Sequence, residues 1–502
     1  MNSRSTSRLA TSELVDLSLE AAANQDVYGS VTRIARKYGV HRRVVEAIRK
    51  ETVEVLTRSF AEAHACTTVQ VTVAHVARCV VALYMIGRCS IWSVVDLLPI
   101  LFPGMKGGGF GTVQRLLVEA ASRAKKFSKD VRLGGIRAAA LDEMFSQGDP
   151  VLAGVDLDTN YLFLVERHDR RTTEDWKAAL EAGKTQGLEL ETVVRDGGAA
   201  IAAGTTAVFP KAKQSDDNLH AQMVITKVLH TVENRAYGAM SRVDKLQRAI
   251  AKEQQCRKPL RLRLSEFKAE LRKAGARCEA LMTEHEELGR LWQRLRAALE
   301  VVDLAQGTLR TSGEMGVELE AVANELLACR RRASRKAGGY IKRRLIGLTN
   351  YADGVHAELE PLSVEFGEEP VVLAMIVLRL VTLLKAQNVG QARRERQRHL
   401  MAAYARLRAT GQPDEVLAAV QSVLHRRYRS SSAIESVNAA LRTHLTIRKR
   451  TTDRFLHLFQ AYFNLRVRRW GRFKSTSAWG LLQGCPAGDW LTHLGLPPTN
   501  QE

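Results

Sequence analysis

Apolar residues near the start of the chain follow the spacing of two short helices joined at a glycine. In SVTRIARKYGV followed by HRRVVEAIRKE, the apolar positions are Ile34, Ala35, Tyr38, Val40, Val45 and Ile48. Gly39 lies at the tight turn between the helices, where a positive φ is required. This pattern predicts a helix-turn-helix unit within residues 1–60. Its second helix would expose polar side chains able to reach base edges or phosphates in a DNA major groove: His41, Arg42, Arg43, Glu46 and Arg49.

Residues 61–132 carry a second helical pattern. The apolar segment SIWSVVDLLPILF precedes a glycine-rich stretch, and a further helix then repeats apolar positions at Val113, Leu116, Leu117, Ala120, Ala121 and Ala124. The glycine-rich stretch GGGFG lacks the Lys-Ser/Thr pair of a phosphate-binding loop. The segment is therefore expected to be either a second helix-turn-helix unit or a plain helical spacer.

The pattern becomes strand-like in residues 133–215. Three short apolar runs, GIRAAALDEMF, PVLAGVDLD and NYLFLVERHD, are separated by turn residues. A helix, TTEDWKAALEAGK, follows with Thr172 as its expected N-cap, and then come a fourth strand in ETVVRDGG and a fifth in AVFP. The order βββαβ predicts a mixed sheet flanked by helices.

Residues 216–420 read as an all-helical segment rich in Ala, Leu, Glu, Lys and Arg. Long helices are expected near 240–256, 262–300, 316–335 and 371–410, packed as a bundle. Residues 475–502 are expected to be a tail with little regular structure. The predicted fold class is therefore α+β, mostly α.

Composition places the chain among folded, multidomain proteins. Of 502 residues, 45% are hydrophobic and 26% are charged, and no apolar run reaches the roughly 20 residues that a membrane span requires. The N-terminus lacks the apolar core of a secretory signal, and the seven cysteines form no CxxC pair. We therefore expect a cytoplasmic protein without a membrane partner, a disulfide framework or a cysteine-type zinc site.

Positive charge is concentrated near the C-terminus. The chain has 75 Lys and Arg against 54 Asp and Glu, a net charge of +21. Between residues 422 and 474, 13 Lys and Arg face only two acids, Glu435 and Asp453. Because such a run repels itself without counter-anions, it favours a nucleic-acid partner over a merely solvated surface.

Two aspartates follow apolar strand patterns. Asp142 is expected at the end of the first strand, on the same face of the sheet as Ala138 and Ala140. Asp196 ends the fourth strand, and the glycines after it, Gly197 and Gly198, are expected to leave the space above it open. Carboxylates at neighbouring strand ends suit a hard divalent cation such as Mg²⁺, which leaves coordination positions for phosphate and water.

A third acid lies in a strongly basic helix. In SSSAIESVNAALRTHL, the residues Ile434, Val437 and Leu441 form an apolar face, and Glu435, Asn438 and Arg442 form the neighbouring face. An isolated glutamate there is explained if it completes a metal site while Asn438 and Arg442 meet phosphate oxygens. The next basic cluster, expected to contact further phosphates, is Arg448, Lys449 and Arg450.

The motifs ALDEMF, VVRDGGAA and SSSAIESVNAALR, in that order, resemble those of DDE-type transposases of bacterial insertion sequences. The downstream DDNLH and FLHLFQAYFNLRVRRW add to the resemblance. It implies an RNase H-like core, formed by residues 133–215 and 421–474 and interrupted by the helical insertion. It also implies that Asp142, Asp196 and Glu435 bind two Mg²⁺ ions, for which Mn²⁺ could substitute.

The same resemblance implies an enzyme that cuts the ends of its mobile element and joins the freed 3′-hydroxyl to target DNA. The partners would be the terminal inverted repeats, the target DNA and further copies of the chain, at least a dimer. In the bacterial cell it would work at the nucleoid. The insertion would serve assembly and the handling of DNA ends.

Several alternatives remain open at this level. Asp156 and Asp158 rival Asp142 as the first acid. Asp217 rivals Glu435 as the third, because 239 residues separate Glu435 from Asp196. His220 could be a metal ligand or a proton relay near the metals, or it could simply be packed or solvated. Trp292 could stack on an unpaired base, or it could belong to a hydrophobic core. The competing functions are a non-enzymatic helix-turn-helix and coiled-coil regulator, and an RNase H-like nuclease that cuts without joining.

Overall fold

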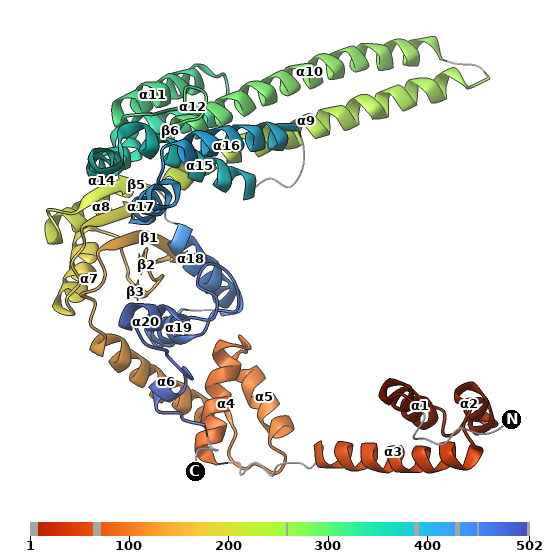
Figure 1. Cartoon of the computed structure of the whole chain (residues 1–502). Helices are drawn as coiled ribbons and strands as arrows, with labels where there is room; N and C mark the ends of the chain where they lie inside the picture. The colour runs from red at the N-terminus through yellow and green to blue at the C-terminus, as the bar shows by residue number, and fades with distance from the viewer. Residues whose placement is uncertain are drawn as a thin grey trace. The chain divides into compact units, whose positions relative to one another are not determined.

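The computed structural model describes residues 9–63, 72–257, 260–385, 391–426, 432–448 and 451–498. The chain divides into two compact units, Met1–Thr72 and Val73–Glu502, and each is described by itself (Figure 1). Within the described ranges, no helix combines the length and apolar character needed to cross a bilayer.

The first unit consists of three helices, α1 (Thr11–Ala23), α2 (Ser30–Tyr38) and α3 (Arg42–Ala63). Gly39 ends α2 with a φ of 67°, the left-handed conformation that the predicted tight turn requires. The small core of this unit combines Leu17 and Ala21 of α1 with Ile34, Ala35, Val40 and Val45. The two helices predicted from the apolar pattern therefore form, and α1 covers the face that they share.

Three helices precede the sheet in the second unit, namely α4 (Val73–Met85), α5 (Ile91–Leu101) and α6 (Phe110–Asp130). The apolar face predicted for α6 is buried, apart from the half-buried Leu116. Helix α6 packs against α19 (Asp453–Leu465), so the segment before the sheet contributes to the main core.

A mixed five-stranded sheet lies at the centre of this unit, in the order β3-β2-β1-β4-β5. Strand β1 is antiparallel to β2 and parallel to β4, β2 is antiparallel to β3, and β4 is parallel to β5. These are the order and directions expected of an RNase H-like core, and the α+β, mostly α fold class is confirmed. The strands are β1 (Ala138–Ser146), β2 (Asp149–Asp156), β3 (Leu162–Arg167), β4 (Thr192–Arg195) and β5 (Lys213–Asp216).

Two helices alternate with the last strands. Helix α7 (Thr173–Thr185) begins at the predicted cap, because the Thr172 side chain accepts from the Asp175 amide. Helix α8 (Ala199–Val208) ends within the AVFP segment in which a fifth strand was expected, and no residue of that segment lies in a strand, so that prediction is wrong. The apolar residues Ile201 and Val208 are buried as one helix face, whereas β5 consists of the polar segment KQSD and carries no apolar pattern.

The sheet separates two cores. Ala138, Ala140 and Met144 of β1 belong to the core that also contains α18 (Ser432–Leu445) and α19. Ala139 and Leu141 belong to the core beneath α7 and α8. Because successive side chains of a strand point to opposite faces, even-numbered β1 residues face α18 and odd-numbered ones face α7.

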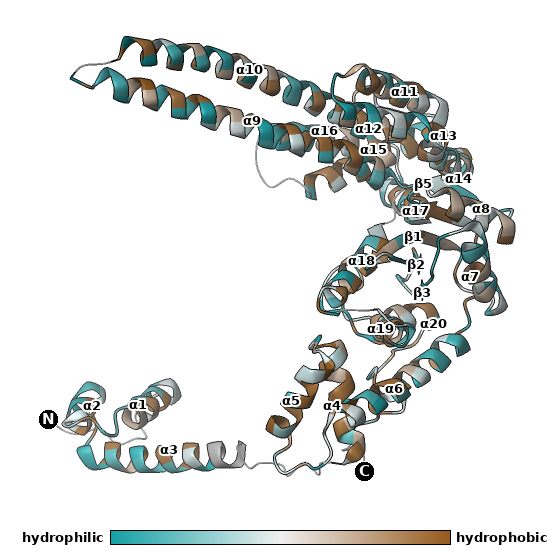
Figure 2. Ribbon diagram, turned by 180° about the vertical axis from the view of Figure 1, so that it is seen from behind, coloured by the Kyte–Doolittle hydropathy of each residue, from teal (hydrophilic) through white to brown (hydrophobic). Residues whose placement is uncertain are grey.

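The insertion begins with a long antiparallel hairpin of α9 (Asn218–Gln254) and α10 (Arg261–Ala298), drawn in Figures 1 and 2. Figure 2 shows hydrophilic and hydrophobic residues interspersed along both helices. A two-stranded sheet of β6 (Val302–Asp303) and β7 (Thr308–Leu309) follows. The insertion was predicted to be all-helical, and this small sheet is an exception to that prediction. The remaining helices are α11 (Ser312–Ala328), α12 (Arg332–Lys342), α13 (Leu345–Thr349), α14 (Tyr351–Phe366), α15 (Glu368–Lys385), α16 (Gln391–Ala409) and α17 (Pro413–Arg426).

The C-terminal segment packs into the main core. It contains α20 (Ala478–Gln483) and a 3₁₀ turn, η2 (Thr492–Leu494). Trp490, Leu491 and Leu494 are buried in the core of α18 and α19. Apart from these two short elements the described part of the segment is irregular. Its few apolar residues, although too widely spaced to give a helical pattern, fill space beside α6 and α19.

Candidate active site

Asp142 and Asp196 lie side by side because of the register between two parallel strands. Leu141 of β1 is paired with Arg195 of β4, so the next residues, Asp142 and Asp196, are neighbours as well. Asp142 is even-numbered and faces α18. It is not at the end of its strand as predicted, because β1 continues in the hairpin with β2 after β4 has ended.

Helix α18 covers this pair of acids. Its predicted apolar face of Ile434, Val437 and Leu441 is buried, and the helix packs on β1 and β2. Asn438 is fully buried, and its Nδ2 donates to Asp142 Oδ2 at 2.6 Å. This placement does not fit the predicted contact between Asn438 and DNA phosphates, because the amide is enclosed and already bonded to the acid.

Negative charge surrounds the Asp142 carboxylate. Its pKa is raised to about 7, first by burial and next by the charge of Asp196, and Glu435 acts in the same direction. Hydrogen bonds from the Glu143 amide, at 2.8 Å, and from Asn438 oppose this shift. Repelling carboxylates in a partly buried site are stabilised by a cation.

Glu143, the next residue of β1, belongs to the opposite face of the sheet. Its carboxylate accepts from Trp176 Nε1 at 3.0 Å and from Arg171 Nη1 at 2.8 Å. The charge of Glu143 is therefore neutralised under α7, and the acid does not join the cluster beneath α18.

The loop after Asp196 is held by the insertion. Tyr340 donates its hydroxyl to the Asp196 carbonyl at 3.2 Å, and Arg344 Nη2 donates to the Gly197 carbonyl at 2.9 Å. Gly197 has a φ of 89°, and a Cβ there would lie 2.2 Å from Arg344 Nε. The space that the glycines were expected to leave open is therefore filled by Arg344. No local signal identifies Tyr340 and Arg344, since they lie more than 140 residues from the acid they help to position.

The rival first acids lie elsewhere. Asp156 is paired with Ala139, three residues before Asp142, and shares the face that packs under α7 and α8. Its carboxylate accepts from the Thr159 amide at 3.0 Å and thereby stabilises the turn after β2. Asp158 is exposed in the same turn. Neither residue neighbours Asp196.

Asp217, the rival third acid, follows β5 and caps α9. Its Oδ1 accepts from the Leu219 amide at 2.8 Å, and its own amide donates to the Arg195 carbonyl. Asp217 therefore lies on the side of β4 away from β1. The acids whose charges act most strongly on Asp142 are Asp196 and Glu435.

Residues 141–358 match a family model for ISL3-type DDE transposases, described as Transposase. This match supports a DDE-type insertion-sequence transposase. The match contains Asp142 and Asp196 and extends into the insertion, whereas Glu435 lies beyond it. No curated protein matches the chain.

DDE transposases generally use divalent metals. Among the residues that the structure describes, no three His, Cys, Asp or Glu side chains are grouped closely enough to hold a metal ion. Two observations fit a cation here: the raised pKa of Asp142, and the buried Asn438 Oδ1, which has no hydrogen-bond partner within the described residues. The available donors are all oxygen atoms, as Mg²⁺ prefers.

The basic residues predicted to bind DNA differ in their surroundings. His41, Arg42 and Arg43 are exposed at the start of α3, while Arg49 is half-buried and donates to the Gln25 carbonyl at 3.4 Å. Arg442 is exposed on α18.

Arg448 is part of the packed interior. Its guanidinium lies 4.4 Å from the centre of the Tyr84 ring and 4.3 Å from that of Phe455, and it donates to the Tyr84 and His444 carbonyls. This arrangement does not fit the predicted phosphate contact. Lys449 and Arg450 lie outside the described residues.

Two further residues whose roles were left open by the sequence, His220 and Trp292, pack against neighbouring side chains. The His220 ring lies 5.6 Å from the Tyr340 ring, which favours the packed alternative. Trp292 packs against the core of α9 to α13, with Arg296 at 4.7 Å over its ring, which favours a core tryptophan over a base-stacking one.

Replacing Asp142 by asparagine is expected to raise the unfolding temperature of the metal-free protein by a few degrees at about pH 8. The pKa of Asp142 is about 7 in the fold against an ordinary 3.8, so folding takes up a proton between these values and stability falls as pH rises through that window. Above pH 7 the wild type carries a buried carboxylate that the variant lacks. Calorimetry at about pH 8 and about pH 4 measures this, and a variant no more stable than wild type at the higher pH contradicts it.

Proposed function

We propose that this transposase cuts DNA at the ends of its mobile element and joins the freed 3′-hydroxyl to target DNA, with Asp142, Asp196 and Glu435 as the catalytic acids. The observation that carries the proposal is the meeting of Asp142 and Asp196 beneath α18, where Glu435 also acts on the Asp142 pKa. An all-oxygen, negatively charged site that leaves room for phosphate suits phosphodiester chemistry.

The three acids would hold two Mg²⁺ ions, or Mn²⁺ in their place, which would stabilise charge on the reacting phosphate and lower the pKa of an attacking water. The chain's own contribution is to orient the acids. Asn438 fixes Asp142 Oδ2, and the Gly198 amide donates to Asp196 Oδ1 at 3.0 Å. Tyr340 and Arg344 hold the loop on which Asp196 lies.

DNA binding would be divided between two regions. The exposed start of α3, with His41, Arg42 and Arg43, suits reading of the terminal repeats in a major groove. The basic C-terminal region suits sequence-independent contacts with phosphates. Because two ends must be held together before joining, the active form would be at least a dimer.

A strand-transfer assay tests the proposal. Purified protein, Mg²⁺ and a labelled duplex that ends in the terminal inverted repeat are incubated with a supercoiled plasmid, and joined products are sought on a gel. Covalent joining of the labelled 3′-end to plasmid is expected. Cleavage without joining would instead identify a nuclease, and sequence-specific binding without cleavage would identify a regulator.

Substitutions in the two basic regions are expected to have different effects on DNA binding. Arg42→Ala or Arg43→Ala should reduce the preference for element ends by about 1–3 kcal/mol, if these side chains contact bases. Arg442→Ala should weaken binding on every sequence and lower the salt slope by about one unit.

The matched control is Arg36→Ala, because Arg36 is exposed on α2, the first helix of the pair. It should leave sequence preference unchanged. Filter binding across a salt series measures both quantities, and a loss of sequence preference in Arg442→Ala alone would reverse the assignment.

A further inference from the structure

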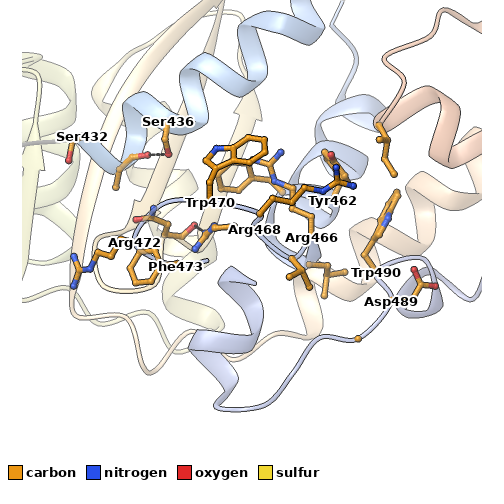
Figure 3. Close-up of a pocket in the computed structure, with 18 of the residues that line it drawn as sticks. Ser432, Ser436, Tyr462, Arg466, Arg468, Trp470, Arg472, Phe473, Asp489 and Trp490 are labelled. Carbon is orange, nitrogen blue, oxygen red and sulfur yellow. Dashed lines mark hydrogen bonds between the residues drawn. The ribbon is translucent and has the colours of Figure 1, made fainter. Parts of the chain in front are cut away.

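A cleft of about 960 Å³ opens beside α18, on the C-terminal part of the chain (Figure 3). It is bordered by the turn after α4, the turn after β2, the start of α18, the end of α19 and the segment that follows α19. Ser432 and Ser436 of α18 contribute to its wall, and Glu435 lies between them in the sequence. The cleft therefore adjoins the helix that carries the proposed third catalytic acid.

The cleft is strongly cationic. It is lined by five arginines and one acid, Asp489, and that acid already forms an ion pair with Arg78 at 2.5 Å. Within the described residues, none of these arginines forms an ion pair with a carboxylate: Arg88, Arg466, Arg468, Arg469 and Arg472. Such a concentration of uncompensated guanidinium groups favours an anionic ligand.

Arg468 is fixed in place by hydrogen bonds to the backbone. It is half-buried and donates to the Thr159 carbonyl at 3.3 Å, and its pKa is lowered to about 10, first by burial and then by Arg466. The chain thus holds two guanidinium groups close together at an energetic cost, which a bound anion would offset.

Aromatic rings alternate with the arginines. Phe473 has Arg468 at 5.2 Å and Arg472 at 5.0 Å from its ring centre, and Tyr462 packs edge-on against Trp490 at 5.1 Å. Trp470 is 76% exposed, and Figure 3 shows its indole among the labelled arginines. An indole this exposed offers an aromatic face on which a ligand can stack.

We propose that this cleft binds an unpaired nucleotide at the DNA end, with its base stacked on Trp470 and its phosphates held by the arginines. Guanidinium groups beside an exposed aromatic face are the combination that single-stranded nucleic acids require. Duplex DNA would offer the arginines its phosphates but would keep its base faces stacked inside, beyond the reach of Trp470. The inference rests on the proposed function only in taking DNA as the ligand.

Fluorescence anisotropy tests the proposal on the full-length chain. The probes are a labelled blunt duplex and the same duplex with a short thymine overhang, both in EDTA so that no strand is cut. The wild type should bind the overhang duplex about tenfold more tightly than the blunt one, as expected from one stacked base. Equal affinity for the two probes would overturn the proposal.

Variants at one exposed position separate stacking from folding. Trp470→Leu keeps an apolar side chain without an aromatic face and should lose the overhang preference, while binding of the blunt duplex stays unchanged. Trp470→Phe keeps an aromatic face and should retain most of the preference. Arg472→Ala should weaken binding of the overhang probe and reduce its salt dependence. An undiminished preference in Trp470→Leu would overturn the assignment.

This readout is independent of catalysis. If the overhang preference is found but joining is absent from the strand-transfer assay, the proposed function fails and the cleft assignment stands. If joining occurs without any overhang preference, the cleft assignment alone fails.

Discussion

Asp142→Asn, Asp196→Asn and Glu435→Gln are each expected to abolish DNA cleavage and joining while leaving DNA binding largely intact. The replacements preserve side-chain shape but remove an anionic ligand from the proposed metal site. The loss should amount to several kcal/mol of transition-state stabilisation, roughly a thousandfold or more in rate. The measurement is single-turnover cleavage of a labelled element end in Mg²⁺, with binding of the same duplex followed in parallel.

Asp156→Asn is the matched control for the first acid. Asp156 is a buried carboxylate on the neighbouring strand, but it lies toward the opposite face of the sheet. Its substitution should lower stability at most and leave the cleavage rate of the folded protein unchanged. Loss of cleavage in Asp156→Asn but not in Asp142→Asn would reassign the first acid, and full activity in any of the three variants would remove that residue from the site.

Shortening the α9–α10 hairpin is expected to abolish the pairing of two DNA ends without unfolding the core. Arg242 pairs with Glu270 across the hairpin, and Gly238 and Ala274 line one groove between its helices, so residues 239–273 can be replaced by a short Gly/Ser turn in register. The buried contacts of this hairpin with the rest of the insertion lie nearer its base, for example at Val232 and Leu288. We infer that its outer part, where Met240 and Leu262 are exposed, contacts another copy or DNA.

The whole insertion is a poorer choice for deletion. Asn350 donates to the Gln214 carbonyl at 2.7 Å, and Arg344 lies 3.9 Å from the buried Asp216 of β5. Removing residues 221–415 would therefore expose the sheet edge and release the Asp196 loop. A native gel with labelled ends measures pairing in the shortened variant, and the cleavage of single ends serves as its control. A two-ended complex at wild-type yield would show that the outer hairpin is dispensable.

Much of the local structure follows from short-range patterns. The turn at Gly39, the Thr172 cap and the apolar face of α18 depend on residues a few positions apart, so spacing and propensity predict them directly. The order of elements from β1 to β4 has the same origin. Strand β5 cannot be predicted from local spacing, because it is short and polar. Its extended conformation is stabilised by pairing with β4 and not by an apolar pattern of its own.

The sequence by itself determined the α+β class and singled out the candidate acids, because both depend on residue type and periodicity along the chain. The interrupted core was implied by the resemblance to DDE-type transposases. Only the tertiary structure decided which of these residues meet. Pairing of Leu141 with Arg195 across about 50 residues brings Asp142 to Asp196, and packing of α18 encloses Asn438 against Asp142. Packing of distant segments also holds the partly buried Arg448 between aromatic rings, and the insertion places Arg344 over Gly197. Strand register and helix packing arise from contacts between distant segments, which local spacing does not encode.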